Sequence, residues 1–279
     1  MKLNNLDLYI TTKCQLNCNG CYLKFQDEEW NEDNLKEIVE SNIFQNVTNV
    51  IDILGGEPTI SPLLFHLITY IRNQNKDVKI EITTNAIRLI HDEEYLKNFI
   101  NCCKKNNVSV KISWHYNKDI IKPLLELKKN DIFNYLIFVP NNVNKLEELQ
   151  KTYDKMKMIC KCVWRPYINP NISQEENKII IDFLLHQKDQ YNIQSATRFV
   201  DGNLKNNIEL IGISNLDKNF YKNYKCACGY TGIIFVDGLF YYCLSQGMIK
   251  DNPIKVSNIQ NIMWKRCIYD YCSCDCYEL

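Results

Sequence analysis

The sequence lacks the long hydrophobic runs and the excess of one charge that are typical of membrane proteins and of nucleic-acid-binding proteins. Its longest wholly apolar run is residues 239–244, whereas about 18 apolar residues are needed to span a bilayer. No signal-like apolar stretch develops before Asp7. The 33 basic residues balance the 33 acidic ones, so no overall field draws the chain toward nucleic acid or anionic lipid. We therefore expect a cytoplasmic protein that binds neither nucleic acid nor a membrane.

The sequence also has too few cysteines for a disulfide scaffold. Fourteen cysteines in 279 residues is about 5%, against the roughly 8–10% of such scaffolds, and no export signal is present. Three cysteines lie within residues 14–21 and seven within residues 226–276, with only four between them. This clustering favours metal binding or redox chemistry at two places in the chain.

Short β-rich runs alternate with amphipathic segments over residues 6–164, and no other internal repeat is present. This order predicts repeated βα units and a parallel sheet, an α/β fold. We expect strands at residues 6–11, 49–54, 78–83, 108–114, 133–139 and 158–164. We expect helices at residues 33–44, 61–75, 92–106, 118–129, 143–155 and 173–190. Caps such as Asp33, Ser61 and Asp92 stand at their starts, and a capping box from Ser173 to Glu176 opens the last.

The βα pattern ends after residue 190. Residues 191–225 are expected to form a connector with one strand near 196–200. Residues 226–279 are rich in cysteines and turns, with a hairpin predicted over residues 233–242 around Gly238, which is expected to need a positive φ. So short a segment would not hold a core alone, so we expect a metal centre to stabilise it. The predicted domains are therefore residues 1–190, the connector 191–225, and residues 226–279.

Three cysteines directly follow the first predicted strand. Cys14, Cys18 and Cys21 have the spacing Cys-x3-Cys-x2-Cys at the carboxyl end of the predicted sheet, where active sites of such barrels lie. Three thiolates can hold three irons of a [4Fe–4S] cluster and leave the fourth iron open to a substrate or cofactor. A zinc ion completed by a remote ligand, or a set of free thiols, is the alternative interpretation.

A second motif, Gly55-Gly56-Glu57-Pro58, follows the second predicted strand at the same edge of the sheet. Glycine lets a backbone approach a ligand, and Glu57 can accept hydrogen bonds from an ammonium group. Alone, the motif is also explained by a tight strand-to-helix turn. In combination, the two motifs closely resemble the radical S-adenosylmethionine (radical SAM) enzymes, and the resemblance covers residues 6–164.

The resemblance implies a partial (β/α)6, TIM-like barrel in which Cys14, Cys18 and Cys21 bind the catalytic [4Fe–4S] cluster. Its open iron would bind the amino and carboxylate groups of S-adenosylmethionine, and residues 55–57 would hold the methionine ammonium. Reduction by a donor such as flavodoxin or ferredoxin would release a 5′-deoxyadenosyl radical, which abstracts a hydrogen atom from the substrate.

Polar residues that follow three further strands are expected at the ribose and carboxylate of the cofactor: Thr84, Asn85, Ser113, His115 and Arg165. Gly20 replaces the aromatic residue that many relatives place against the adenine, and Tyr22 is expected to take over part of that packing. The alternatives are a wall position for His115 and a surface position for Arg165.

A second group of cysteines lies near the C-terminus: Cys226, Cys228, Cys243, Cys267, Cys272, Cys274 and Cys276. The arrangement Cys228-x9-Gly-x4-Cys243 resembles the auxiliary-cluster domains called SPASM and twitch, although the last four cysteines depart from the SPASM spacing. This resemblance implies one auxiliary [4Fe–4S] cluster on Cys228, Cys243 and two of the last four. Zinc, or a second and incompletely ligated cluster, is the alternative.

The four remaining cysteines are predicted mainly as core residues. Cys102 and Cys103 lie in a predicted helix, and Cys160 and Cys162 lie on one face of a predicted strand. Cys160 or Cys162 facing the cavity would instead donate a hydrogen atom to a substrate radical, as cysteines do in radical SAM epimerases, and Cys226 is a further candidate donor.

Three functions are consistent with these motifs. We expect a radical SAM enzyme that modifies a ribosomally made peptide by cross-linking, thioether formation or epimerisation. A separate leader-peptide-binding protein would assist it, because no such module precedes the first strand. The alternatives are a radical SAM dehydrogenase of a sugar, aminocyclitol or other small molecule, and a non-catalytic adaptor that binds zinc or an iron–sulfur cluster.

Overall fold

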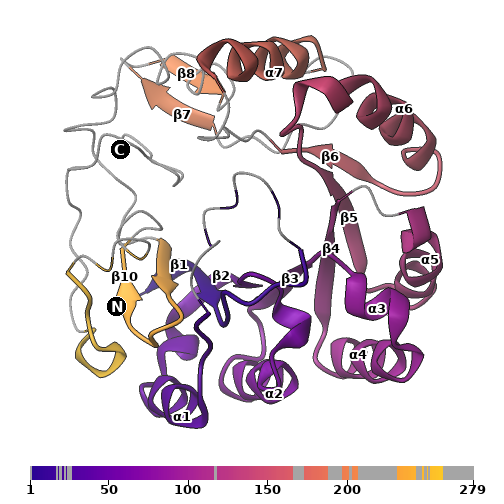
Figure 1. The fold of residues 1–279 in the computed structure, drawn as a ribbon. Helices are drawn as coiled ribbons and strands as arrows, with labels where there is room; N and C mark the ends of the chain where they lie inside the picture. Colours follow the sequence, from indigo (N-terminus) through magenta and orange to yellow (C-terminus); the bar gives the residue numbers. More distant parts are fainter. Residues whose placement is uncertain are drawn as a thin grey trace. The chain divides into compact units, whose positions relative to one another are not determined.

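The computed structural model describes residues 2–16, 18, 21, 23, 27–115, 118–165, 173–187, 197–200, 203–206, 231–242, 247, 250 and 252–259. The chain divides into two compact units, whose helices and strands are labelled in Figure 1. Unit 1 comprises Met1–Asn17, Tyr22–Asn134 and Cys228–Met263, and unit 2 comprises Cys18–Cys21, Tyr135–Ala227 and Trp264–Leu279.

Unit 1 is built on a sheet of six strands in the order β10-β9-β1-β2-β3-β4. All of its pairings are parallel except that of β10 with β9. The strands are β1 (Leu3–Tyr9), β2 (Val47–Leu54), β3 (Lys79–Thr84), β4 (Val108–Trp114), β9 (Thr231–Ile234) and β10 (Phe240–Tyr241). The parallel β/α order confirms the predicted α/β class.

The helices of unit 1 alternate with these strands: α1 (Glu32–Glu40), α2 (Leu64–Gln74), α3 (Ile87–His91), α4 (Glu93–Lys105) and α5 (Ile121–Lys129). Unit 1 also contains four short 3-10 helices among the described residues: η1 (Ile43–Asn46), η2 (Pro58–Ile60), η3 (Lys118–Ile120) and η5 (Val256–Asn258). One face of the sheet is formed by aliphatic side chains that are fully buried: Leu6, Leu8, Ile51, Ile53, Ile80, Ile82, Val110 and Ile112. Alternation of residues along a strand places these side chains on one side, and they form the core.

Caps and turns define the ends of the helices. The Asp92 side chain accepts a hydrogen bond from Tyr95 N and caps α4, as its position in the sequence predicts. At α1, however, the cap is Asn31 in a reciprocal capping box with Asn34, so the predicted start at residue 33 is wrong. The predicted helix 33–44 ends at Glu40, because Asn42 adopts a left-handed conformation before η1.

The opposite face of the sheet carries a cluster of charged side chains. Lys111 on β4 is 4% exposed and pairs with Asp52 on β2 and with Glu81 on β3, whose Oε2 lies 3.0 Å from its Nζ. Lys79 and Asn134 also contact Glu81. Burial raises the pKa of Glu81, but the Lys111 and Lys79 ammonium groups outweigh this effect and hold the pKa below its usual value. The cluster therefore depends on Lys111 to separate two neighbouring carboxylates.

Replacing Lys111 by methionine is expected to lower the free energy of unfolding by about 2 kcal/mol at neutral pH, because Asp52 and Glu81 lose their shared cation. The lowered pKa of Glu81 stabilises the fold above its unfolded-state pKa, and this stabilisation is lost as the pH falls through the folded-state pKa. The difference between variant and parent should therefore shrink toward acid pH, as measured by urea unfolding of the apoprotein.

Lys122→Met is the matched control, since its pair with Glu93 is exposed to solvent and is expected to contribute little to stability. Equal losses in the two variants, or a loss in Lys111→Met that does not change with pH, would contradict the role of the cluster.

The C-terminal hairpin belongs to the sheet of unit 1. The predicted hairpin is confirmed as β9 and β10, and Gly238 at its turn has φ +75°. Its strand β9 also pairs in parallel with β1. Trp30 Nε1 donates a buried hydrogen bond of 2.7 Å to Phe235 O, which ties the turn to the start of α1. The predicted boundaries at residues 190 and 226 stay predictions.

Unit 2 contains the parallel pair β5 (Phe133–Phe138), of which residues 133 and 134 fall in unit 1, and β6 (Cys162–Trp164). It also contains η4 (Val143–Lys145), α6 (Leu146–Met156), α7 (Gln174–Gln187) and the hairpin β7 (Thr197–Val200) and β8 (Asn203–Asn206). Trp164 stacks on Tyr153 with ring centroids 4.4 Å apart, and Phe138 packs against both rings. The predicted capping box from Ser173 to Glu176 is confirmed.

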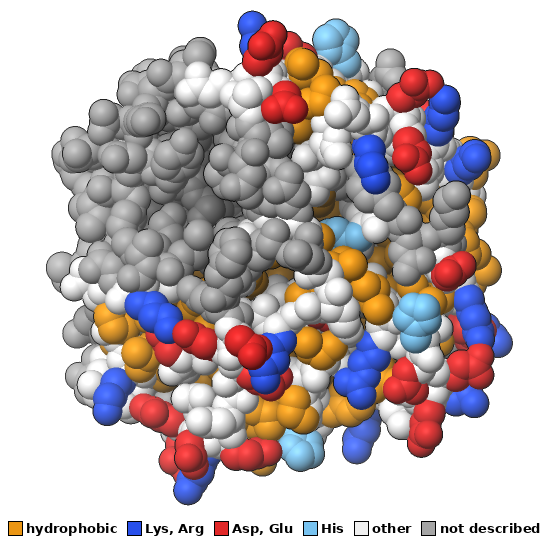
Figure 2. Space-filling model, in the orientation of Figure 1, with side chains coloured by type: hydrophobic (Ala, Val, Ile, Leu, Met, Phe, Trp, Pro, Cys, Tyr) orange, Lys and Arg blue, Asp and Glu red, His pale blue; other side chains and the backbone are white. Residues whose placement is uncertain are grey.

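The predicted strand 158–164 is correct only from Cys162 onward. Turn hydrogen bonds from the end of α6 extend through Cys160, and Met158 is 83% exposed. No pairing among the described strands closes a full barrel. Within the described residues, every helix lacks the length or the hydropathy that a membrane-spanning segment requires. Figure 2 shows acidic and basic side chains interspersed among the described residues of the face in view.

Candidate active site

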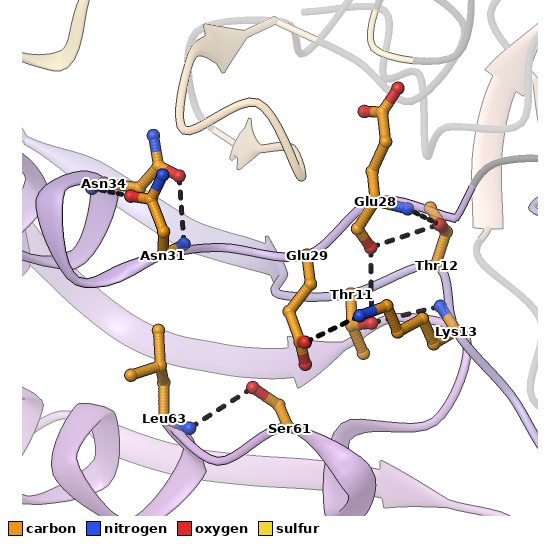
Figure 3. Close-up of polar contacts among 9 residues, drawn as sticks. All are labelled: Thr11, Thr12, Lys13, Glu28, Glu29, Asn31, Asn34, Ser61 and Leu63. Carbon is orange, nitrogen blue, oxygen red and sulfur yellow. Dashed lines mark hydrogen bonds and ion pairs between the residues drawn. The ribbon is translucent and has the colours of Figure 1, made fainter.

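The segment that carries the three cysteines leaves the sheet after β1 and returns beside its own starting point (Figure 3). Thr12 N donates to Glu28 O at 2.9 Å, and Glu28 N donates back to Thr12 Oγ1 at 2.9 Å. Lys13 Nζ pairs with Glu29 Oε2 at 3.1 Å, and Trp30 N donates to Ile10 O. These contacts fix both ends of the cysteine-bearing segment at the carboxyl end of β1.

The glycines after β2 hold the backbone against the start of this segment. Gly56 N donates to Thr11 O at 2.7 Å, and Glu57 N donates to Lys13 O at 2.8 Å. A Cβ at Gly55 would lie 2.5 Å from Thr11 O, and one at Gly56 would lie 2.3 Å from Lys13 O. No side chain fits at either position, so the two glycines allow the end of β2 to bind the residues immediately before Cys14.

Gly56→Ala is expected to push the segment away from β2, because its Cβ would meet backbone oxygens that cannot rotate away. We expect the free energy of unfolding to fall by about 1–3 kcal/mol and iron retention after reconstitution to fall with it. Thermal unfolding and iron analysis measure both effects. Gly247→Ala is the control, because its Cβ would meet only the Phe235 ring at 3.3 Å. Full iron retention in Gly56→Ala would contradict this role.

The Glu57 carboxylate joins the end of β2 to the end of β3. Its side chain is buried, and its Oε1 accepts hydrogen bonds from Thr59 N, Thr59 Oγ1 and Thr84 Oγ1 at 3.1, 2.6 and 2.6 Å. Its Oε2 accepts one from Asn85 N at 2.6 Å. Burial raises the pKa of Glu57 despite these four bonds, which lower it. Glu57 therefore has a structural role that the sequence did not reveal, and its contact with a cofactor stays a prediction.

The Asn85 side chain reaches the first cysteine. Its Nδ2 lies 3.5 Å from Cys14 Sγ and 3.4 Å from Gln15 Oε1. Leu16 N also donates to Cys14 Sγ, at 3.4 Å. The structure thus brings together Cys14, the two glycines, Glu57, Thr84 and Asn85, all within unit 1. It was not predicted that Asn85 would contact a cysteine, because no sequence pattern links two residues that are 71 positions apart.

The other predicted cysteine ligands lie in unit 2 or outside the described residues. Cys18 and Cys21 belong to unit 2, where Cys21 N donates to Cys18 O at 3.3 Å. Within the part of the chain that the structure describes, no three Cys, His, Asp or Glu side chains are grouped to hold a metal ion. The following predicted residues lie outside the described part: Tyr22, Cys226, Cys228, Cys243, Cys267, Cys272, Cys274 and Cys276.

Three polar candidates lie at or after the ends of other strands. Ser113 is half-buried on β4, and His115 follows that strand. Burial lowers the pKa of His115, which keeps its imidazole neutral at physiological pH. In unit 2, Arg165 N donates to Phe138 O and extends the pairing of β5 with β6. Their cofactor contacts stay predictions.

The other described cysteines are mostly core residues. Cys103, Cys160 and Cys162 are buried, and Cys102 is half-buried on α4. Burial raises the pKa of both helix thiols, so they remain protonated. Cys160 Sγ and Cys162 Sγ lie 3.8 Å apart, in keeping with the prediction that they share a face.

Residues 8–132 match the family model of the Radical SAM superfamily. The chain contains a radical SAM domain. The matched residues include Cys14, Cys18 and Cys21, the Gly-Gly-Glu-Pro motif, the end of β1 and the whole of β2, β3 and β4. The match supports the predicted radical SAM class for this part of the chain.

A probable GTP 3′,8-cyclase of Methanococcus maripaludis is 35% identical over 102 residues, which is 35% of this chain and 33% of that protein. Two solved structures share the fold of the radical SAM domain. SuiB of Streptococcus suis, bound to S-adenosylmethionine, has a TM-score of 0.60 at 16% identity, over 92% of this chain and 64% of SuiB.

The protein anSMEcpe, with bound AdoMet and Cp18Cys peptide, has a TM-score of 0.62 at 17% identity, over 93% of this chain and 79% of that one. At such identities these likenesses show the fold, and they confirm the predicted partial TIM-like architecture. The chain spans a third of the cyclase and less than two thirds of SuiB.

The radical SAM domain implies a catalytic [4Fe–4S] cluster and S-adenosylmethionine, and the donor set fits the cluster. Cys14 is exposed, and its sulfur already accepts two N–H donors, which suits a ligating thiolate. Cys14, Cys18 and Cys21 would supply three sulfur ligands and leave one iron open, and this assignment stays a prediction.

Proposed function

We propose that this protein cleaves S-adenosylmethionine reductively and uses the product to modify a ribosomally made peptide. The observation that best supports the proposal is the backbone pairing of Gly56 and Glu57 with Thr11 and Lys13. It brings the cysteine-bearing segment and the predicted cofactor-binding motif to one place at the carboxyl ends of β1 and β2. Active sites of barrels built from parallel strands lie at this edge.

In this proposal Cys14, Cys18 and Cys21 hold the catalytic cluster, which when bound supplies the electron that cleaves the cofactor. Residues 55–57 bind the methionine ammonium near that cluster. Ser113 and the neutral His115 offer hydrogen bonds to the ribose without adding charge, and Arg165 pairs with the carboxylate.

The peptide class is supported by two solved neighbours. SuiB has been solved bound to the precursor peptide SuiA, and anSMEcpe has been solved with a bound Cp18Cys peptide. By analogy with these peptide-bound neighbours, we propose that the present protein cross-links a peptide, forms a thioether in it or epimerises one of its residues. A separate leader-peptide-binding protein and a flavodoxin or ferredoxin are the proposed partners. An auxiliary [4Fe–4S] cluster on Cys228, Cys243 and two of the last four cysteines completes the proposal.

The test offers the reconstituted enzyme two substrate pools under anaerobic conditions in deuterated water. One pool contains unmodified ribosomal precursor peptides, and the other contains sugars and aminocyclitols. We expect 5′-deoxyadenosine to rise with the peptide pool, together with the loss of two hydrogen atoms or the gain of solvent deuterium in one peptide. Turnover with the small-molecule pool alone would replace the peptide assignment by dehydrogenation. No 5′-deoxyadenosine with any pool or without substrate would refute the function.

A further inference from the structure

We infer that Asn85 is a positioning residue that raises the reduction potential of the catalytic cluster by donating a hydrogen bond to the sulfur of Cys14. The inference rests on the proposed function, since it takes Cys14 as a ligand of the cluster. The contact itself joins Asn85 Nδ2 to Cys14 Sγ at 3.5 Å within unit 1. Nitrogen-to-sulfur separations of this size are ordinary for a donor to a thiolate.

The orientation of the Asn85 amide follows from its other contacts. Its Oδ1 accepts a hydrogen bond of 2.9 Å from Ile87 N, the first residue of α3. Only the carbonyl oxygen of an amide can accept from a backbone N–H, so the NH2 group must be the one that faces Cys14 Sγ. The Gln15 Oε1 atom, 3.4 Å from the same Nδ2, is also an acceptor and agrees with this orientation.

The backbone of Asn85 is held as firmly as its side chain. Asn85 N donates to the buried Glu57 carboxylate at 2.6 Å, and Asn85 is only 7% exposed. The next residue, Ala86, adopts a left-handed conformation with φ 61° and donates to Thr84 Oγ1, which closes the turn. The donor is therefore preorganised by the turn after β3, and the Cys14 sulfur also accepts a hydrogen bond from Leu16 N at 3.4 Å.

A hydrogen-bond donor at a ligating sulfur changes the reduction potential of an iron–sulfur cluster. Reduction adds negative charge to the cluster, and part of that charge resides on the cysteine sulfurs. An N–H group directed at one of these sulfurs stabilises the reduced form more than the oxidised form, so it raises the potential. Removing the donor should make the cluster harder to reduce, without removing any ligand.

Asn85→Asp tests this effect sharply. The aspartate keeps the acceptor for Ile87 N and nearly the same shape, but it replaces the donor near Cys14 Sγ by a carboxylate oxygen. The matched control is Asn142→Asp, since the Asn142 side chain caps η4 through the same kind of bond, to Asn144 N at 3.0 Å. The full chain is reconstituted anaerobically, and its iron content and midpoint potential are measured by redox titration with electron paramagnetic resonance.

The signal that responds to S-adenosylmethionine identifies the catalytic cluster. We expect Asn85→Asp to retain its iron and to lose about tenfold in the equilibrium constant for one-electron reduction, which is a shift of about 59 mV to more negative potential. We expect Asn142→Asp to titrate as the parent does. An unchanged potential in an iron-loaded Asn85→Asp would overturn the inference and leave the proposed function intact, whereas a parent without a responsive cluster would refute the proposed function itself.

Asn85→Ser covers the case in which Asn85→Asp loses iron. Serine keeps a short acceptor for Ile87 N, cannot reach Cys14 Sγ and adds no charge. A negative shift in Asn85→Ser supports the inference, and an unchanged potential overturns it. Iron loss in both variants also overturns it, because Asn85 would then hold the cysteine-bearing segment in place rather than tune the cluster.

Discussion

Replacing any one of Cys14, Cys18 and Cys21 by alanine is expected to abolish the formation of 5′-deoxyadenosine. Each of the three is expected to ligate one iron of the catalytic cluster, and the spacing Cys-x3-Cys-x2-Cys offers no fourth thiol nearby to take its place. A cluster with a missing ligand is lost or cannot bind the cofactor in its productive position. The measurement is the amount of 5′-deoxyadenosine formed by the anaerobically reconstituted variant with dithionite.

Cys102→Ala is the matched control for the cysteine variants. This cysteine lies half-buried on α4, where burial raises the pKa of its thiol and keeps it protonated. It should retain both its iron and its cofactor cleavage. Undiminished 5′-deoxyadenosine from any of the three loop variants would contradict the assignment of the catalytic cluster.

Replacing Glu57 by alanine is expected to destabilise the fold by about 3–5 kcal/mol. The variant leaves the buried donors Thr59 N, Thr84 Oγ1 and Asn85 N without their acceptor and creates a cavity between β2 and β3. Iron retention should fall together with stability, because the backbone N–H groups of Gly56 and Glu57, at the same end of β2, hold the start of the cysteine-bearing segment. Urea unfolding and iron analysis of the same preparations measure the two effects.

A role limited to binding the cofactor predicts a different result for Glu57. In that case Glu57→Ala would keep its iron and its stability and would lose only affinity for S-adenosylmethionine, measured by equilibrium dialysis. Glu94→Ala is the control, because Glu94 is exposed on α4 and its loss should change stability by no more than about 0.5 kcal/mol. Stability of Glu57→Ala equal to that of Glu94→Ala would contradict the structural role.

The elements that the sequence predicts well are those with strong local patterns. The strands β2, β3 and β4 and the helices α2 and α4 fall within a few residues of their predicted limits, because apolar periodicity and caps such as Asp92 are local signals. The short helix α3 was missed, since its five residues are too few to show a helical period. The strand predicted over residues 158–164 was too long, because a β-rich composition does not reveal the turns after α6.

The features that the sequence did not predict depend on contacts between residues that are far apart in the chain. The parallel pairing of β9 with β1 joins segments more than 220 residues apart, and the sequence contains no local pattern that specifies this partner. At the site, motif spacing identified the cysteines and the Gly-Gly-Glu-Pro segment. It did not reveal that Gly56 pairs with Thr11, or that Asn85 reaches Cys14, because both depend on how the carboxyl ends of β1, β2 and β3 meet.

The most direct test of the account is the iron and acid-labile sulfide content per chain after anaerobic reconstitution, with electron paramagnetic resonance of the reduced protein before and after adding S-adenosylmethionine. The account predicts about eight irons, four for each cubane, and one signal that the cofactor perturbs. About twelve irons would mean that the C-terminal cysteines hold two clusters and would leave the catalytic assignment in place. Bound zinc, or about four irons whose signal does not respond to the cofactor, would contradict the central claim that Cys14, Cys18 and Cys21 hold a catalytic cluster.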